Sequence, residues 1–404
     1  MICFVAVLAL AAASTLTRQL VTHDPMARCI DGTWPGFYHR RSTTGSNNWL
    51  LVLLGGGWCH TPSECYQRSQ TLYGSSSFWP RTLDHGLGLT SANASTNPTF
   101  HDWNVIVYIY CDGSSYSGGL VAPYLFNGTT LFSRGQAIFD AVLTDIERRW
   151  SVDSTAQRAV LYGESAGGIG CLSHVDQLAA RWANVDVRGL CDSSFFIPVA
   201  AFSPPNTTVV IPTMSNVFKF FNVTAGLDQS CIAGEAEPFR CLIAETIVPY
   251  ISAPLFMLQS QVDCDQFENV DLGCLPAPDN LPAPTPACNA TQLSYIKWFQ
   301  HQMRRRAAQA GLLAGKHGLF FDSCIHHSIA LFGGYWNDPA YTIGGVTAAG
   351  AVALWLADQP AVFADSLLFP HANTRCVAAF QSCLGDLNLP PWQCGNASWQ
   401  AHDC

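Results

Sequence analysis

The segment Gly163-Glu164-Ser165-Ala166-Gly167 places a serine between two glycines, each two residues away. A short apolar run over 158–162 precedes it, and residues 168–182 after it have the composition of a helix. In a sharp strand-to-helix turn, flanking glycines leave room for the backbone, and the serine hydroxyl is exposed at the carboxyl end of the sheet. The N–H of Ala166 then faces the place where an oxyanion would form. We predict that Ser165 is a nucleophile rather than part of a plain connecting loop.

A serine hydroxyl is a weak nucleophile at neutral pH, so it needs a base beside it. For a serine on such a turn the chain order is serine, then aspartate or glutamate, then histidine. Two histidines, His326 and His327, follow a pair of phenylalanines, in the position expected of a loop after a strand. His174 is too close to Ser165 on the same helix, and His402 lies in the terminal tail. Residue type and spacing leave His326 and His327 as equal candidates.

The acid that orients the histidine is expected just past another strand. An apolar run over 255–258 is followed by two carboxylates, Asp263 and Asp265. Asp263 is the first candidate and Asp265 the second, although a carboxylate in such a loop can also cap a turn. The residues by themselves do not separate the two.

A run of glycines, Gly55-Gly56-Gly57, follows an apolar run and ends at Trp58. Backbone N–H groups in such a run can converge on a developing oxyanion, and one such donor contributes ~3 kcal/mol to transition-state stabilisation. The alternative is a tight turn with no chemical role. Because the run stands well before the serine in the chain, we favour the second half of an oxyanion hole.

A metal site is the competing interpretation of the histidine segment, since Cys324 and His327 have the spacing of a metal-binding pair. No matching second pair lies near them in the sequence. We therefore expect no metal, and the ester chemistry that we predict needs no cofactor.

Apolar runs typical of strands alternate along the chain with segments typical of helices, and these elements could position the residues named above. Apolar runs over 49–54, 104–110, 158–162 and 255–258 predict buried strands of a mostly parallel sheet. Residues 136–150 have helical periodicity. The apolar stretch 342–357 is interrupted by glycine and threonine, so it predicts a buried helix rather than a membrane span. We expect a single α/β domain with helices on both faces of the sheet.

Composition narrows the function classes. The chain has 404 residues, of which 49% are hydrophobic and only 12% are charged, about half of the ~25% that is usual for soluble domains. The formal net charge is −9, which argues against a nucleic-acid partner because no large basic face can form. A sizeable core is expected.

The amino terminus and the cysteines predict export. Residues 1–13 form a short apolar run ending in Ala-Ala-Ala, typical of a signal peptide, which leaves 14–404 as a single predicted domain. Without Cys3 the chain keeps sixteen cysteines, an even number that suits disulfides in an oxidising compartment. A cysteine-rich segment at about 370–404 closes the chain. N-glycosylation sequons that favour N-linked glycans stand at Asn93, Asn127, Asn206, Asn222, Asn289 and Asn396.

Several blocks in order resemble the pectin acetylesterase/Notum family of secreted carboxylesterases. They are LGGGWC at 54–59, YCDGSS at 110–115, GESAGG at 163–168, CDSSFF at 191–196, PLF at 254–256 with Asp263, and SCIHH at 323–327. The resemblance implies an α/β-hydrolase-like fold, disulfide bridges and a Ser-Asp-His triad.

The resemblance also implies particular residues. The family's histidine stands three places after the cysteine, which is His327, and its aspartate nine places after the proline, which is Asp263. Oxyanion N–H groups are implied at Gly56, Gly57 and Ala166. Glu164 departs from the family, where small or polar residues often stand.

The function that we predict from these features is that of a secreted serine carboxylesterase. Its predicted location is outside the cell, with the cell wall as one candidate site. Its expected substrate is an O-acetylated polysaccharide. A Notum-like hydrolase of a fatty-acyl ester on a protein is the main alternative. Others are an acyltransferase and a non-catalytic carbohydrate-binding module. Trp58, Phe195 and Phe196 are candidates to line the substrate site.

Overall fold

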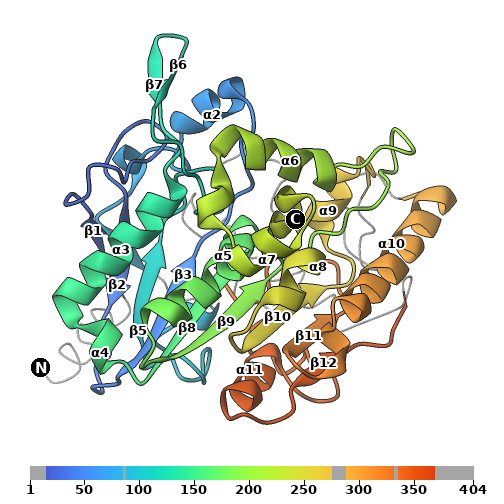
Figure 1. Cartoon of the computed structure of the whole chain (residues 1–404). Coiled ribbons are helices and arrows are strands. Elements are labelled where there is room, and N and C mark those ends of the chain that lie inside the picture. The colour runs from blue at the N-terminus through green and yellow to red at the C-terminus, as the bar shows by residue number, and fades with distance from the viewer. Residues whose placement is uncertain (1–14, 85–87, 275–287, 332–334, 369–404) are drawn as a thin grey trace, which may run out of the picture.

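The computed structural model describes residues 15–84, 88–274, 288–331 and 335–368. Within these residues a central sheet has ten strands in the order β12-β11-β10-β9-β8-β3-β5-β2-β1-β4 (Figure 1). The strands are β1 (Thr15–Leu20), β2 (Gly36–Arg40), β3 (Asn48–Leu53), β4 (Thr82–Asp84), β5 (Asn104–Tyr108), β8 (Arg158–Glu164), β9 (Asp186–Asp192), β10 (Leu255–Ser260), β11 (Gly318–Asp322) and β12 (Val362–Ala364). The predicted mostly parallel α/β fold is confirmed.

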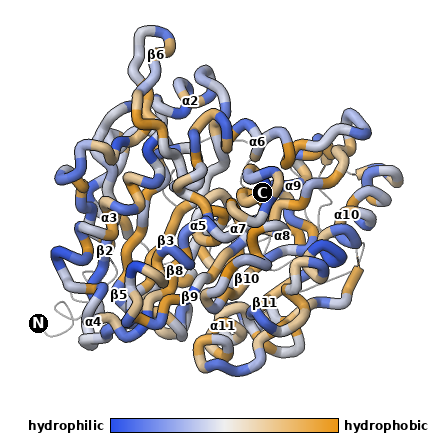
Figure 2. The backbone as a smooth tube through the Cα atoms, viewed as in Figure 1, coloured by the Kyte–Doolittle hydropathy of each residue, from blue (hydrophilic) through white to orange (hydrophobic). Residues whose placement is uncertain are grey.

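Seven neighbouring strands, from β12 to β5, run parallel, and β2, β1 and β4 continue the sheet with antiparallel pairing. The parallel strands other than β12, at the edge of the sheet, are almost entirely buried, which explains why β3, β5, β8 and β10 are continuous apolar runs in sequence. Figure 2 shows this hydrophobic centre along β3, β8 and β9. The four strands predicted from apolar runs are β3, β5, β8 and β10.

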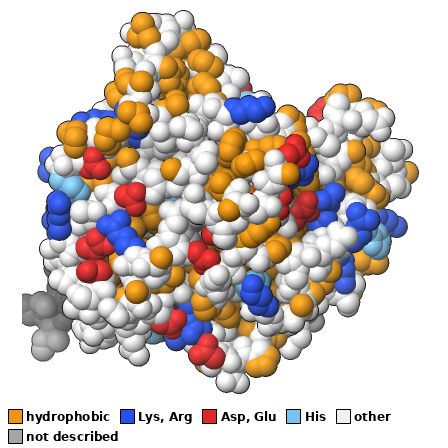
Figure 3. All heavy atoms as spheres, viewed as in Figure 1, with side chains coloured by type: hydrophobic (Ala, Val, Ile, Leu, Met, Phe, Trp, Pro, Cys, Tyr) orange, Lys and Arg blue, Asp and Glu red, His pale blue; other side chains and the backbone are white. Residues whose placement is uncertain are grey.

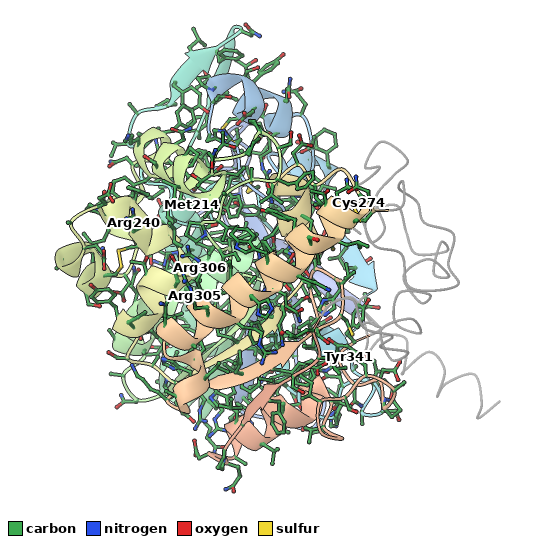
Figure 4. All side chains as sticks on the ribbon, turned by 90° about the vertical axis from the view of Figure 1, so that its right-hand side faces the viewer. Met214, Arg240, Cys274, Arg305, Arg306 and Tyr341 are labelled. Atoms are coloured by element: carbon green, nitrogen blue, oxygen red, sulfur yellow. A yellow bond between two sulfur atoms is a disulfide. The ribbon has the colours of Figure 1, made fainter. Side chains whose placement is uncertain are left out.

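Helices flank the sheet. The longer ones are α2 (Pro62–Ser69), α3 (Gly135–Trp150), α5 (Ala166–Arg181), α6 (Val210–Phe221), α10 (Ala290–Gln309) and α11 (Ala348–Leu356). Shorter ones are α4 (Val152–Thr155), α7 (Gln229–Gly234), α8 (Ala244–Ile247) and α9 (Cys264–Asn269). Helix α5 packs on β8 and β9, and α11 on β10 and β11. Nη1 of Arg306 in α10, a residue labelled in Figure 4, donates to both carboxylate oxygens of Glu245 in α8, at 2.6 and 2.7 Å.

The helix predicted over 342–357 is shorter than expected. Gly344 and Gly345 have positive φ angles of 60° and 83°, and Ile343 pairs with Val346 in a tight turn. Thr347 then caps α11, accepting a hydrogen bond from the N–H of Gly350. The glycines therefore make a turn before the helix. In the described part of the chain no helix is long and apolar enough to cross a membrane.

Outside the central sheet, the described residues form one strand pair and several disulfides. The hairpin of β6 (Tyr124–Phe126) and β7 (Thr129–Leu131) projects from the body, and hydrophobic side chains gather on it (Figure 3). Disulfides join Cys29–Cys111, Cys59–Cys65, Cys171–Cys191, Cys231–Cys241 and Cys274–Cys288. Cys264 and Cys324 are also disulfide-bonded. The predicted signal peptide, the 275–287 loop and the 370–404 segment lie outside the described residues.

Candidate active site

Ser165 occupies the turn between β8 and α5 in a conformation that few residues adopt. Its φ is 53° and its ψ −124°, and its backbone N–H donates to the carbonyl of Asp192 at 2.9 Å. A Cβ on Gly163 would lie 2.1 Å from the carbonyl oxygen of Gly167, and one on Gly167 would lie 2.1 Å from that of Leu53. Only glycine fits at either place, as the sequence pattern predicts. The strained turn holds the serine at the end of the sheet, at 7% exposure.

His327 and Asp263 come from loops that follow neighbouring strands, β11 and β10. The Nδ1 of His327 lies 2.9 Å from Oδ1 of Asp263, which is completely buried. Asp263 also accepts hydrogen bonds from the side-chain amide of Gln259 and the N–H of Asp265. The aspartate therefore orients the imidazole through Nδ1. In the described chain, Nε2 of His327 is buried and has no hydrogen-bond partner.

The neighbouring His326 is engaged elsewhere. Its Nε2 lies 3.0 Å from Oδ1 of Asp322 and 3.0 Å from the hydroxyl of Tyr341, which is labelled in Figure 4. Its ring stacks on Tyr335 with 4.5 Å between centroids, and the residue is 2% exposed. The structure thus separates the two histidines that residue spacing leaves equal. Each imidazole keeps one buried nitrogen without a partner in the described chain, Nδ1 of His326 and Nε2 of His327. The two differ in their surroundings, because the rings of Tyr335 and Tyr341 pack against His326, whereas the loop residue after His327 is tied to Glu164 beside the serine turn.

The two aspartates are separated in the same way. Asp263 is completely buried against the imidazole of His327. Asp265 is only partly buried, and its side chain accepts from the amide of Asn269 one helical turn later, in α9. Asp265 therefore accepts a hydrogen bond within α9, and its charge also raises the pKa of His327.

The loop that carries His327 is anchored to the strand ends beside Ser165. The N–H of Ser328 donates to the hydroxyl of Ser193 at 2.8 Å, and the hydroxyl of Ser328 donates to Glu164 at 2.8 Å. Glu164 is the residue before the serine. The next two N–H groups, at 329 and 330, donate to the carboxylate of Asp192. The structure shows no hydrogen bond between the side chains of Ser165 and His327. Such bonds often tighten only when substrate binds.

The glycine loop lies directly against the serine turn. A Cβ on Gly55 would lie 2.8 Å from Cβ of Ser165, and the N–H of Gly55 donates to Oε1 of Glu164 at 2.7 Å. Gly56 and Gly57 have φ angles of 131° and 64°, which favour glycine. The loop therefore depends on glycine both for its conformation and for its close approach to Ser165.

Two side chains hold the carbonyls of this loop. Arg68 donates to the carbonyl of Gly56 at 2.7 Å, and the hydroxyl of Tyr110 donates to that of Gly57 at 2.9 Å. In a trans peptide the N–H is opposite the carbonyl, so the N–H groups of Gly57 and Trp58 face the other way. Within the described residues, no hydrogen bond occupies the N–H of Gly56, Gly57, Trp58 or Ala166. Sequence reasoning missed Trp58 as a donor, although it follows the glycine run.

Aromatic rings border the imidazole. The ring of Phe196 lies 6.3 Å from that of His327 and 5.4 Å from that of Trp58. The indole N–H of Trp58 donates to the hydroxyl of Ser115 at 2.8 Å, which fixes the ring. Phe195 is 1% exposed and is part of the hydrophobic core. Phe196 thus lies beside His327, and Trp58 lies beside Phe196. Phe196 is itself 3% exposed and belongs to the same core as Phe195.

The charges around the imidazole are mostly negative. Burial lowers the pKa of His327, but the carboxylates of Asp263 and Asp265 outweigh this effect and, with Glu164, raise the pKa to about 10. Burial raises the pKa of Glu164, and His327 opposes that rise. Burial also raises the pKa of Asp192. The site therefore stabilises a positive charge on His327, the charge that a general base acquires when it takes a proton.

Metal chemistry has no support in the arrangement of side chains. The described chain contains no group of three or more histidine, cysteine, aspartate or glutamate residues placed to hold an ion. Cys324, the metal-like partner of His327 in sequence, is disulfide-bonded.

A parallel sheet with a strained serine turn between a strand and a helix is the architecture of an α/β hydrolase. The structure of the Wnt deacylase Notum from Drosophila has the same fold. Its TM-score is 0.77 at 22% identity, covering 90% of this chain and 99% of that one.

The family is shown by sequence. The family model described as Pectinacetylesterase matches residues 10–377, and the chain belongs to this family. Pectin acetylesterase 5 of Arabidopsis thaliana is 31% identical over 372 residues, covering 89% of this chain and 84% of that protein. The palmitoleoyl-protein carboxylesterase NOTUM of Schmidtea mediterranea is 30% identical over 315 residues, covering 75% of this chain and 56% of that protein. The chain is thus related to carboxylesterases of both kinds.

Proposed function

We propose that the protein is a serine carboxylesterase in which Ser165, His327 and Asp263 form the catalytic triad. The observation that carries this proposal is the serine turn, which is fixed beside a histidine loop whose imidazole is oriented by a buried aspartate. Among the residues that the structure describes, none forms a hydrogen bond with Nε2 of His327, as expected of a nitrogen that receives the serine proton.

The reaction follows from this geometry. The hydroxyl oxygen of Ser165 attacks the ester carbonyl while His327 takes the hydroxyl proton at Nε2. Asp263 keeps the Nδ1 proton in place and stabilises the imidazolium. His327 then gives its proton to the departing alcohol, which leaves an acyl group on Ser165. Water, deprotonated by His327, attacks this acyl-enzyme and releases the acid.

The oxyanion of each tetrahedral intermediate is held by backbone donors. Ala166 contributes the N–H that follows the nucleophile, at the start of α5. Gly56 and Gly57 contribute from the glycine loop, and the orientation of the loop adds the N–H of Trp58 as a further candidate. No cofactor enters this mechanism.

The substrate that we propose is an O-acetylated polysaccharide. The pectin acetylesterase relative is 31% identical over 89% of this chain, against 30% over 75% for the planarian NOTUM and 26% over 90% for the NOTUM of Mus musculus. The cavity behind Phe196, lined by Ile197, Val199 and Phe299 among others, has a volume of about 10 Å³. That is roughly room for one water, so this particular cavity cannot hold a long acyl chain.

Replacing Ser165 by alanine tests the reaction. Ser165→Ala should abolish hydrolysis of an aryl acetate and leave the melting temperature close to that of the wild type, since the side chain has few contacts to lose. Wild-type turnover by the variant would exclude Ser165 from the mechanism.

Acyl length tests the substrate. Turnover of aryl acetate should exceed that of aryl octanoate on the same enzyme, because the aromatic wall is close to the imidazole. Preference for octanoate would favour a fatty-acyl ester instead. Faster transfer of acetyl to added alcohol than to water would identify an acyltransferase, and a folded protein that phosphonate esters do not label would identify a binding module.

We further propose that the protein is secreted as one domain, 14–404, after removal of residues 1–13. The disulfides support an oxidising compartment. Five sequon asparagines, Asn93, Asn127, Asn206, Asn222 and Asn289, are exposed and accessible to glycosylation. Asn396 lies outside the described residues. Mass loss on deglycosylation of protein from culture medium tests both points.

A further inference from the structure

Glu164 is a buried carboxylate at the carboxyl end of β8. It is 7% exposed, and both of its oxygens accept hydrogen bonds. Oε1 accepts from the N–H of Gly55 at 2.7 Å, and Oε2 accepts from the hydroxyl of Ser328 at 2.8 Å. A carboxylate this far from water is costly unless its hydrogen bonds and charged neighbours compensate.

The two partners of Glu164 belong to the two other segments of the proposed site. Gly55 is the residue before Gly56 in the oxyanion loop, and Ser328 is the residue after His327. Glu164 itself precedes Ser165. One side chain therefore joins the serine turn, the oxyanion loop and the histidine loop, which lie more than one hundred residues apart in the chain.

We propose that Glu164 is a positioning residue that holds these three segments in register and places a negative charge beside His327. The inference rests on the proposed esterase function. Glu164 does not touch the reacting atoms. It acts through the backbone of the oxyanion loop and through the histidine, whose imidazolium form its charge stabilises.

The other groups around this cluster set the sign of the effect. His327 is the positive partner of Glu164, and Asp192 is a second buried carboxylate from β9. The phenols of Tyr116 and Tyr162 also face Glu164, and burial raises the pKa of both well above 10, so both stay neutral. Asp263 and Asp265 act on His327 from the β10 side. Among these groups only His327 opposes the burial of negative charge, so Glu164 and His327 favour each other's ionised forms.

The substitution Glu164→Gln removes the negative charge of the side chain and keeps its size and shape. Glutamine keeps an oxygen for the N–H of Gly55 and can donate its amide to the hydroxyl of Ser328, but it carries no charge. We expect kcat for aryl acetate to fall about tenfold with KM little changed. The acidic limb of the kcat/KM profile should move to lower pH by on the order of one unit, because His327 loses a stabilising charge.

Two further variants separate the effect of the hydrogen bond between Glu164 and Ser328 from the effect of the negative charge of Glu164. Ser328→Ala removes one hydrogen bond and keeps the charge, so kcat should fall while the acidic limb stays in place. Glu164→Ala removes both and should lower kcat by roughly 10²-fold or more. If the alanine variant does not fold, the glutamine variant still tests the proposal.

The outcomes distinguish this inference from the proposed function. If hydrolysis disappears in Ser165→Ala but Glu164→Gln keeps the kcat and the acidic limb of the wild type, the role of Glu164 is wrong and the esterase proposal stands. If hydrolysis persists in Ser165→Ala, the proposed function fails, and the role of Glu164 fails with it. A lower kcat and a shifted limb in Glu164→Gln, with Ser165-dependent hydrolysis, support both.

Discussion

Two adjacent histidines in this structure each pair with an aspartate, but one packs inside a loop and the other is the proposed catalytic base. His327 meets Asp263 through Nδ1, and its Nε2 is without a partner in the described chain. His326 meets Asp322 and Tyr341 through Nε2, and its Nδ1 is likewise without a partner in the described chain. The side chain of His327 is 13% exposed, whereas that of His326 is 2% exposed.

The contrast shows that a histidine–aspartate pair is not by itself a catalytic signature. What differs is which nitrogen the aspartate holds and what the other nitrogen faces. The Nε2 of His327 is on the side of the ring away from its aspartate, in a loop tied to the serine turn. The ring of His326 is stacked on Tyr335 and packs the base of the same loop.

The largest effect is expected when the proposed base is removed. His327→Ala should lower kcat/KM for aryl acetate by about 10⁶-fold, the scale seen when a triad histidine is lost. Steady-state kinetics checks this, with circular dichroism to confirm the fold. If His326→Ala lowered kcat/KM as much as His327→Ala does, the two histidine–aspartate pairs would not differ in function.

The orienting aspartate comes next. Asp263→Asn should lower kcat by about 10⁴-fold, because the amide favours the wrong tautomer of His327. Asp322→Asn is the matched control on the other pair and should cost far less activity. Equal losses from the two substitutions would show that the pairs are not functionally distinct.

Removing His326 should cost stability more than activity. His326→Ala leaves the buried carboxylate of Asp322 without its imidazole, which should lower the free energy of unfolding by about 3 kcal/mol. Urea denaturation measures this change. A variant as stable as the wild type but without activity would move His326 into the catalytic machinery.

That stability difference should depend on pH. Burial lowers the pKa of His326, but Asp322 outweighs it and raises the pKa above 6.5. A raised pKa stabilises the folded state fully below 6.5, and this contribution is lost as the pH rises through the folded-state value. The difference between wild type and His326→Ala should therefore be larger at pH 6 than at pH 9. An opposite trend in denaturation curves would contradict the pairing.

The smallest expected effect is a shift of the acidic limb of the kcat/KM profile to a pH above the ordinary histidine range. Because the carboxylates raise the pKa of His327, its neutral form is favoured only above the ordinary histidine range. The acidic limb of kcat/KM should lie above pH 6.5 in the wild type. A limb below 6.5 in aryl acetate kinetics would show that the negative charges do not act on the base.

The sequence predicts the central sheet and the serine turn well because both depend on local patterns. Continuous apolar runs mark β3, β5, β8 and β10, since these strands are buried on both faces. Strand β9 is not a continuous apolar run, because it contains the charged residues Arg188 and Asp192. Both are buried, Arg188 with Asp186 and Asp192 with backbone N–H groups of the histidine loop. The antiparallel edge strands give no clear run.

The roles of neighbouring site residues depend on contacts that spacing does not contain. His326 and His327 are one residue apart, and only their partners in space distinguish them. Asp263 and Asp265 differ in the same way, and the family resemblance rather than residue spacing selects the pair found here. Glu164 stands out in sequence as a departure from the family, but its link to Gly55 and Ser328 requires the fold.

The rate at which an aryl phosphonate ester labels the protein tests the central claim most directly, because it needs only the nucleophile and its base. Peptide mass spectrometry should find the adduct on Ser165, formed at similar rates in the wild type and in His326→Ala and far more slowly in His327→Ala. An adduct on another residue, or equal labelling rates in all three proteins, would contradict the account.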